Sequence, residues 1–168
     1  WVRFLGATVD VQGGAATAKF VVQVQGFGPQ GEKVIIDRYN ITESLRDGFG
    51  GGKALIDPGS VPEDWDTLTE RVIRSTYRTE VEGREMRVLH TIVDSNGEDG
   101  VTPNCYAWYR RLRKQRLHGL VTIIKGDKVK LPGTPIKETW VGARNPREKG
   151  DVPMYLLDTN KLKDMVDA

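Results

Sequence analysis

The order of the apolar segments is the feature that most constrains the fold of this chain. Three strand-like runs follow one another near the N-terminus, and only short glycine-containing turns separate them. They cover residues 2–12, 18–26 and 32–41, and they predict a meander of three antiparallel strands. Later apolar runs alternate with helical patterns, which is typical of a mixed sheet with helices packed on its faces. We therefore expect an α/β fold.

The second part of the chain alternates helix and strand patterns. Ser60 and Glu63 have capping-box spacing with Pro62 in the first turn, so a helix is predicted to begin there. The other elements expected are a strand over 86–94, a helix from Thr102 to about Arg116, a strand over 120–125, a strand over 154–158 and a helix from about Thr159. Segments 42–59 and 126–152 are rich in glycine and proline, and we predict that they are loops.

The composition is that of an ordinary globular protein. The 168 residues, of which 29% are charged and 38% hydrophobic, suffice for one domain with a core. The one cysteine, Cys105, excludes an internal disulfide. No apolar stretch approaches the roughly 20 residues of a membrane span, so no membrane association is expected. Because the chain opens on Trp1 rather than Met, we expect residues 1–168 to be a single domain excised from a larger protein.

Aspartates follow several apolar strands at the point where each strand ends. Asp10 ends the first predicted strand, Asp94 ends the strand over 86–94, and Asp158 ends the last strand. Asp164 follows within the C-terminal helix. Carboxylates that converge on one sheet edge suggest a divalent-metal site, and such a site is well suited to phosphodiester cleavage. Each acid also has an ordinary alternative role, as a turn residue, a helix cap or a solvated side chain.

Basic residues supply a second set of candidates. Lys125 follows two isoleucines at a strand end, where it could stabilise charge on a phosphate or remain a solvated lysine. The helix over 102–116 interleaves basic with aromatic side chains, a pattern that suits a nucleic-acid backbone but also an ordinary solvated face. Its candidate DNA-binding residues are Arg110, Arg111, Arg113 and Lys114.

Several better-known phosphate-binding, zinc-binding and catalytic motifs are absent from the sequence. The run Gly50-Gly51-Gly52-Lys53 is not a Walker phosphate loop, since Asp47 and Ala54 stand where glycine and Ser or Thr are required. His90 and His118, with only one cysteine in the chain, do not indicate a zinc site. No G-x-S-x-G nucleophile motif occurs.

Several segments occur in an order that resembles one known family. They are Thr8-Val9-Asp10-Val11-Gln12, Glu63-Asp64-Trp65-Asp66-Thr67-Leu68-Thr69, Val93-Asp94-Ser95-Asn96-Gly97, residues 106–113, Ile124-Lys125-Gly126 and Leu157-Asp158-Thr159 with Lys163-Asp164. Together they look like the C-terminal nuclease half of the lambda-type (gpA-like) large subunit of phage terminase. The resemblance covers nearly the whole chain.

The resemblance implies an RNase H-like fold, a mixed sheet with a three-strand antiparallel meander, further strands and helices on both faces. It implies an endonuclease that cuts double-stranded concatemeric phage DNA during genome packaging with two divalent ions, Mg²⁺ or Mn²⁺. In the longer protein, an ATPase motor domain that this chain lacks would precede the nuclease. The small terminase subunit and the portal are further implied partners, and the cytoplasm of the bacterial host is the implied location.

The resemblance also assigns roles by position. Asp10 and Asp94 match the metal-binding acids of the first and fourth strands, and Lys125 matches the lysine of a Lys-Gly motif. The third metal-binding acid is either Asp164, near the start of the last helix, or Asp158, at the strand end. The family commonly has glycine where this chain has Asn96, which leaves the turn after Asp94 open. Two alternatives remain: another RNase H-like nuclease, such as a resolvase or an exonuclease, and a non-catalytic DNA-binding module.

Overall fold

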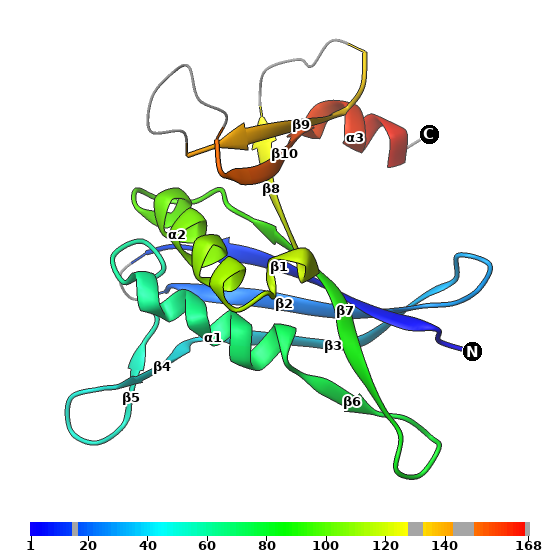
Figure 1. Ribbon diagram of the computed structural model, residues 1–168, viewed down its shortest axis with the longest axis horizontal. Coiled ribbons are helices and arrows are strands. Elements are labelled where there is room, and N and C mark those ends of the chain that lie inside the picture. Colours follow the sequence, from blue (N-terminus) through cyan, green and yellow to red (C-terminus); the bar gives the residue numbers. More distant parts are fainter. Residues whose placement is uncertain (15–16, 128–132, 143–149, 167–168) are drawn as a thin grey trace.

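The computed structural model describes residues 1–14, 17–127, 133–142 and 150–166. Its largest element is a mixed sheet of eight strands in which β6 lies beside β7 and the others follow the order β3-β2-β1-β7-β8-β10-β9 (Figure 1). The strands are β1 (Phe4–Gln12), β2 (Lys19–Phe27), β3 (Lys33–Ile41), β6 (Thr76–Arg78), β7 (Glu85–Asp94), β8 (Val121–Asp127), β9 (Ile136–Val141) and β10 (Val152–Asp158).

Strand directions bring several C-terminal ends to one edge of the sheet. The first three strands form the predicted antiparallel meander. From β1 onward, β7, β8 and β10 pair in parallel, and β9 closes the far edge in antiparallel orientation. Strand β3 is parallel to β1, because both are antiparallel to β2. The C-terminal ends of β1, β3, β7, β8 and β10 therefore share one edge, which we call the carboxyl edge.

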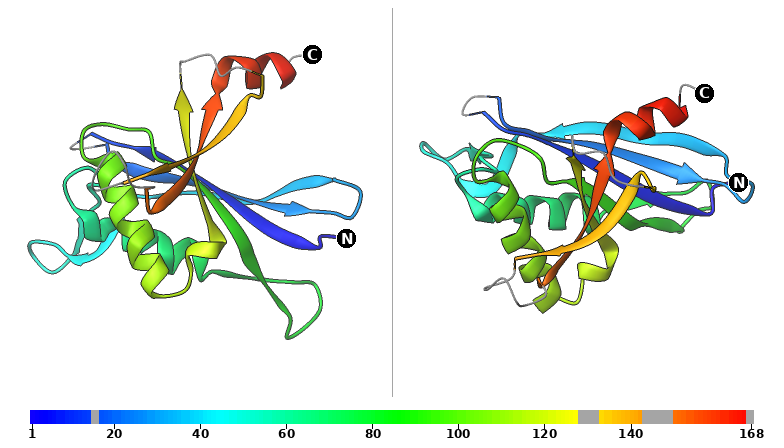
Figure 2. Two further views of the ribbon diagram at one scale, coloured as in Figure 1. Left: turned by 45° about the horizontal axis from the view of Figure 1, so that its top comes forward. Right: turned by 90° about the horizontal axis from the view of Figure 1, so that it is seen from above.

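Helices cover both faces of this sheet, as expected. Helix α2 (Val101–Lys114) and a helical segment composed of η1 (Pro62–Trp65), α1 (Asp66–Leu68) and η2 (Thr69–Ile73) pack on one face. Helix α3 (Thr159–Val166) lies on the other side of the strands, as the right-hand view of Figure 2 shows. A short turn, η3 (His118–Leu120), joins α2 to β8.

The core forms between the first face and the helices because alternate strand residues point toward it. Leu5, Ala7, Val9 and Val11 are buried along β1, while Thr8 and Asp10 between them are exposed. Large aromatic side chains fill the space below, where Phe20 of β2 meets Trp65 with ring centroids 5.4 Å apart and Trp65 meets Trp108 of α2 at 5.6 Å. Both indoles are fully buried, and each donates its N–H to an oxygen within the protein.

The two segments predicted as loops contain additional strands. Residues 42–59 include a separate two-stranded hairpin, formed by β4 (Glu43–Asp47) and β5 (Lys53–Leu55). In residues 126–152, β8 continues to Asp127 and β9 follows at Ile136–Val141, while 128–132 and 143–149 lie outside the described residues. Both loop predictions were wrong in these parts, because glycine-rich composition also fits the turn of a hairpin.

The helix predicted from Ser60 also differs from the structure. Its first turn begins at Pro62 after Val61, no side chain caps it, and the segment passes from 3₁₀ through α to π geometry. The backbone N–H of Ser60 instead donates to Asp57 Oδ1 at 2.9 Å. Strand β6, which was not predicted, places the Tyr77 hydroxyl 3.3 Å from Asp37 Oδ2.

Candidate metal centre

Asp10 and Asp94 lie side by side at the carboxyl edge. Strands β1 and β7 are parallel neighbours in which Val9 pairs with Val93, and the two aspartates follow these valines directly. Since Val9 and Val93 are buried against the helices, alternation directs both aspartates to the opposite face of the sheet. Neighbouring strands are about 4.8 Å apart, so the structure brings these two predicted site residues together.

The two carboxylates interact electrostatically. Asp94 is half-buried, and burial raises the pKa of its carboxyl, with the negative charge of Asp10 acting in the same direction. The backbone N–H of Asn96, 2.9 Å from Asp94 Oδ1, and the charge of Lys125 act to lower this pKa. Asp10 is exposed and accepts a hydrogen bond from Gln12 Nε2 at 2.9 Å. A divalent cation would relieve the repulsion and favour the ionised form of both acids.

Lys125 and Gly126 lie on the next strand. Ile124 of β8 pairs with Asp94, and Lys125 follows it as a half-buried residue. A Cβ added at Gly126 would lie 3.1 Å from Thr159 Cγ2 and 3.2 Å from Asn96 Nδ2. A side chain at this position would therefore push against both the loop after Asp94 and the start of α3.

The turn after Asp94 accommodates asparagine. The backbone N–H and the hydroxyl of Ser95 donate to Ile124 O at 2.9 and 3.1 Å, and Asn96 Nδ2 donates to Gly126 O at 3.3 Å. Among the described non-glycine residues only Arg116 has a positive φ, so Asn96 adopts its conformation without left-handed strain. The difference from the family pattern at this position is thus compatible with an ordered turn.

Asp158, one of the two candidates for a third acid, has structural partners. It is buried, its Oδ1 accepts the Lys161 backbone N–H at 3.1 Å as an N-cap does, and its Oδ2 lies 3.9 Å from Lys161 Nζ. Alternation along β10 places it on the same face as buried Met154, which pairs with Ile123 on the core side. Asp158 is therefore on the face opposite to that of Asp94.

Asp164, the other candidate, is exposed on α3, the helix that lies on the same side of the sheet as Asp10 and Asp94. Within the described residues, no three side chains of His, Cys, Asp or Glu lie close enough together to hold an ion. Two carboxylates nevertheless fit Mg²⁺, which proteins usually bind through one or two carboxylates, with waters and substrate phosphates completing the coordination. The identity of a third acid stays a prediction.

Glu98 is an acid at the carboxyl edge that the sequence analysis did not single out. A Cβ added at Gly13, in the turn that follows β1, would lie 3.2 Å from Cγ and Cδ of Glu98. The Glu98 side chain therefore packs against the turn just beyond Asp10. Its position, four residues after Asp94 in a glycine-containing loop, is the signal that could have identified it.

The basic residues proposed on α2 are largely engaged within the protein. Arg110 binds Asp151 in a bidentate pair, with Nε–Oδ2 at 2.7 Å and Nη2–Oδ1 at 2.8 Å, and Arg113 donates to the Asp151 carbonyl. Arg111 binds Asp66 Oδ1 at 3.0 Å. These three arginines tie α2 to neighbouring segments, which gives them a structural role whether or not they also meet DNA.

The basic residues differ in their distance from the two acids, since Lys114 of α2 lies far from them and Lys19 of β2 lies on their face of the sheet. Lys114 is exposed near the C-terminal end of α2. This helix begins beside Ser95, close to Asp94, where Thr102 Oγ1 donates to Ser95 O at 2.8 Å. At about 1.5 Å per residue, Lys114 is roughly 18 Å further along the helix. Lys19 lies two residues before Val21, the partner of Asp10 on β2, so alternation directs Lys19 to the face of the acids.

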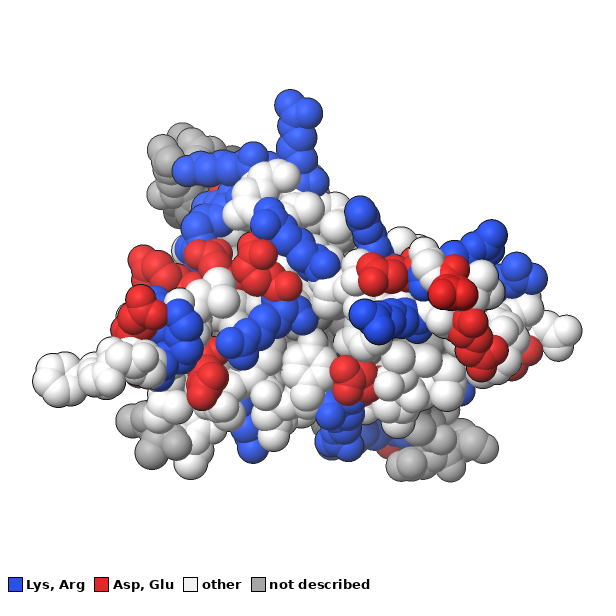
Figure 3. Space-filling model, turned by 90° about the horizontal axis from the view of Figure 1, so that it is seen from below, with Lys and Arg blue, Asp and Glu red and all other residues white. Residues whose placement is uncertain are grey.

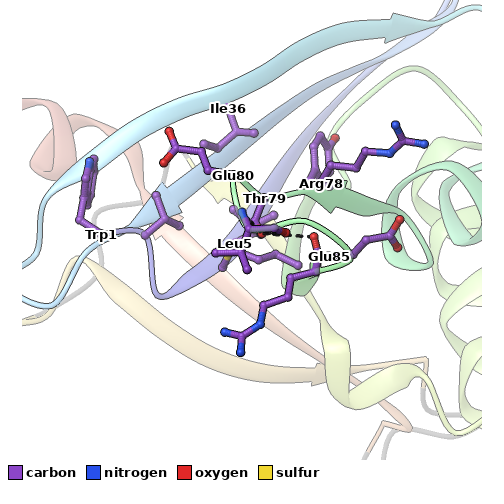
Figure 4. Close-up of a pocket in the computed structure, with 12 residues that line it drawn as sticks. Trp1, Leu5, Ile36, Arg78, Thr79, Glu80 and Glu85 are labelled. Atoms are coloured by element: carbon purple, nitrogen blue, oxygen red, sulfur yellow. Dashed lines mark hydrogen bonds between the residues drawn. The ribbon is translucent and has the colours of Figure 1, made fainter.

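A cavity of about 570 Å³ lies at the opposite end of the sheet. Figure 4 shows its walls, which include Trp1 and Leu5 near the start of β1, Ile36 of β3 and residues of the β6–β7 hairpin such as Thr79 and Glu85. These elements are at the N-terminal ends of β1 and β7, away from the carboxyl edge. The cavity is therefore not part of the candidate metal centre.

A comparison with protein families finds one match over the whole chain. The family model for the terminase large subunit gpA, endonuclease domain, matches residues 1–168. No curated protein and no solved structure matches the chain. In the part of the chain that the structure describes, no helix is long and apolar enough to cross a membrane.

Proposed function

Because the chain belongs to the terminase large subunit gpA endonuclease-domain family, we propose that it cuts double-stranded concatemeric phage DNA at the Asp10–Asp94 edge during packaging. The family supports terminase nuclease activity in DNA packaging. The choice of this site is supported by two interacting carboxylates that lie on adjacent parallel strands and face the same side of the sheet.

We also propose that the fold is RNase H-like. The strand order supports this, since an antiparallel meander is joined through β1 to the parallel strands β7 and β8. Helices on both faces agree with it (Figure 2). The proposal makes Asp10 and Asp94 the acids of the two central strands.

In this proposal, Asp10 and Asp94 hold divalent ions, Mg²⁺ or Mn²⁺, and Asp164 or Asp158 completes the set. Asp164 is the better candidate, because the Asp158 carboxylate caps α3 and lies on the other face. A pair of such ions, when bound, supplies a hydroxide nucleophile and stabilises charge on the leaving oxygen. The charge of Lys125 favours the ionised form of Asp94 and adds positive potential where a phosphate would approach.

DNA would be held mainly through its phosphates. Lys19 is a candidate contact on the face of the acids, and Lys125, two residues after the core-side Ile123, is a candidate contact at the carboxyl edge, in addition to Arg110, Arg111, Arg113 and Lys114 on α2. Contacts to phosphates do not read the base sequence, so cleavage by this domain should depend little on the sequence of the DNA. The ATPase motor domain, the small terminase subunit and the portal as partners, and the host cytoplasm as the location, rest on the family alone.

Plasmid nicking in Mg²⁺ or Mn²⁺ tests the proposal. Asp10→Asn and Asp94→Asn should each reduce cleavage by roughly a hundredfold or more while the protein stays folded. Glu82→Gln, which removes an exposed acid at the other end of the sheet, is the matched control and should cut normally. Undiminished cleavage by a folded Asp10→Asn protein would refute the assignment of the site.

Two further measurements separate the alternatives. A non-catalytic DNA-binding module would bind duplex DNA but show no metal-dependent cleavage or thermal shift. Linear, circular and branched substrates distinguish a packaging endonuclease from an exonuclease, which needs ends, and from a resolvase, which needs junctions.

A further inference from the structure

The β4–β5 hairpin projects from the same edge of the sheet as the two acids. Phe20 of β2 pairs with Val11 on one side and with Ile41 on the other, so β3 ends level with the residue after Asp10. The two strand ends are two strands apart, or roughly 10 Å. The hairpin starts at Glu43, two residues after Ile41, and extends away from the body of the protein (Figure 1).

The tip of this hairpin carries a fully exposed aromatic side chain. Phe49 lies among Gly48, Gly50, Gly51 and Gly52, and its whole side chain is accessible. Gly50 and Gly51 have φ values of +86° and +90°, which glycine adopts readily and which turn the tip tightly. In Figure 3, the projection at the left edge is this hairpin, and it ends in uncharged atoms.

The base of the hairpin is firmly anchored. Asp64, fully buried in η1, accepts hydrogen bonds from Ser44 Oγ at 2.5 Å, from Arg46 Nε at 2.8 Å and from the backbone N–H of Asp57 at 2.6 Å. Lys53 bridges the strands by binding Asp47 Oδ1 at 2.7 Å. Phe49 is therefore carried on an ordered projection at a fixed place beyond the edge.

We propose that the β4–β5 hairpin is a DNA-contacting wedge, in which Phe49 packs against bases or sugars of the duplex beside the cut phosphate. The inference rests on the proposed function, because it takes duplex DNA as the substrate of the Asp10–Asp94 edge. The end of β3, from which the hairpin rises, and the position after Asp10 on β1 are roughly 10 Å apart, so a duplex lying across this edge of the sheet would reach the base of the hairpin. Apolar side chains inserted between base steps are a known way in which proteins grip and bend DNA.

The exposed apolar surface is too small to favour a protein partner. Besides Phe49, only Leu45 and Leu55 of the hairpin are exposed large apolar residues. A stable protein interface takes about 20–30 residues from each side, far more than this projection offers. One aromatic residue suffices for stacking on a base.

Binding of a labelled duplex to the full chain, measured by fluorescence anisotropy in EDTA, tests the wedge without cleavage. Phe49→Ala should weaken binding by about tenfold, since the variant loses the contact of an aromatic ring with a base. Phe49→Tyr keeps the ring and should bind as the wild type does. Val81→Ala is the matched control, because Val81 is an exposed apolar residue in the hairpin at the opposite end of the sheet.

A duplex containing 2-aminopurine reports the contact itself. The wild type and Phe49→Tyr should raise its fluorescence by unstacking a base step, whereas Phe49→Ala should not. Equal affinity and equal fluorescence for the wild type and Phe49→Ala, or no duplex binding by the wild type, would overturn the wedge.

The outcomes for the wedge and for the proposed function are separable. If Phe49→Ala weakens binding but the wild type never cuts in Mg²⁺ or Mn²⁺, the proposed function fails and the wedge stands. If the wild type cuts and Phe49→Ala binds and cuts equally well, only the wedge fails.

Discussion

Asp10, two residues before the end of β1, and Asp94, the last residue of β7, directly follow the paired Val9 and Val93 on adjacent parallel strands, and the charge of Asp10 contributes to the raised pKa of Asp94. The protein thus keeps two acids close together at some cost in stability. Such a cost is expected at a site that binds cations, because a bound cation attracts both carboxylates and so offsets the repulsion between them.

Asp94→Asn should stabilise the metal-free protein at neutral pH. Burial and then Asp10 raise the pKa of Asp94 in the folded state above its unfolded value. The folded protein therefore holds that proton more tightly, and the stability contributed by Asp94 is lost as pH rises through the folded pKa. Asparagine removes this loss, so the gain in Tm should be present at pH 7 and vanish below pH of about 4.

Thermal denaturation between pH 4 and pH 8 in EDTA measures this effect. Adding Mn²⁺ should raise the Tm of the wild type more than that of Asp94→Asn, since the ion binds only the folded site. A Tm difference that does not change with pH would contradict the proposed cause.

Asp64→Ala should destabilise the protein by about 2–3 kcal/mol, because it leaves the Ser44 hydroxyl, the Asp57 N–H and Arg46 without their acceptor. The loss should be smaller than for a fully buried ion pair, because the Arg46 side chain remains 39% exposed to water. Urea denaturation measures the loss. Asp47→Ala, which breaks the exposed pair with Lys53, should cost less than about 1 kcal/mol.

The stabilisation from Asp64 should also depend on pH. Burial acts to raise the pKa of Asp64, but the hydrogen bonds from Arg46 and Ser44 outweigh it and the pKa is lowered. Its contribution is therefore present above the unfolded pKa of about 3.9 and is lost as pH falls through the folded value. The difference between wild type and Asp64→Ala should shrink in acid, and a constant difference would argue against this assignment.

Gly126→Ala should cost about 1 kcal/mol or more and should slow cleavage, because the added Cβ presses on Thr159 and Asn96 beside the proposed site. Gly119→Ala is the matched control, since no atom lies within 4 Å of a Cβ there and its φ is not positive. It should be neutral or slightly stabilising. Chemical denaturation and nicking rates, measured on both variants, check the contrast, and equal effects would show that the close approach at Gly126 is unimportant.

Arg110→Ala and Lys114→Ala should separate structure from DNA binding on α2. Arg110 is held by Asp151 in a bidentate pair, so its loss should cost about 1 kcal/mol of stability. Lys114 is exposed, so its loss should leave stability unchanged. If it contacts a phosphate, Lys114→Ala should reduce the salt dependence of log K for duplex binding by about one unit. An unchanged salt dependence would remove Lys114 from the DNA interface.

Local pattern was sufficient to predict the meander and the main helices. The alternation of Leu5, Ala7 and Val9 has the two-residue period of a half-buried strand, and this period does not depend on distant contacts. The same reasoning failed for residues 42–59. Their strands are held by Asp64, and a glycine-rich composition does not reveal such a partner.

The sequence alone determined that Asp10 and Asp94 each follow an apolar strand, because hydrophobic alternation and turn residues are local properties. Only the tertiary structure decided that these strands are neighbours, in a register that places both acids on one face. It likewise decided that Asp158 caps α3 and that Arg110 binds Asp151. The physical reason is that strand pairing and side-chain partners depend on segments that are distant in the chain and meet only when the core forms.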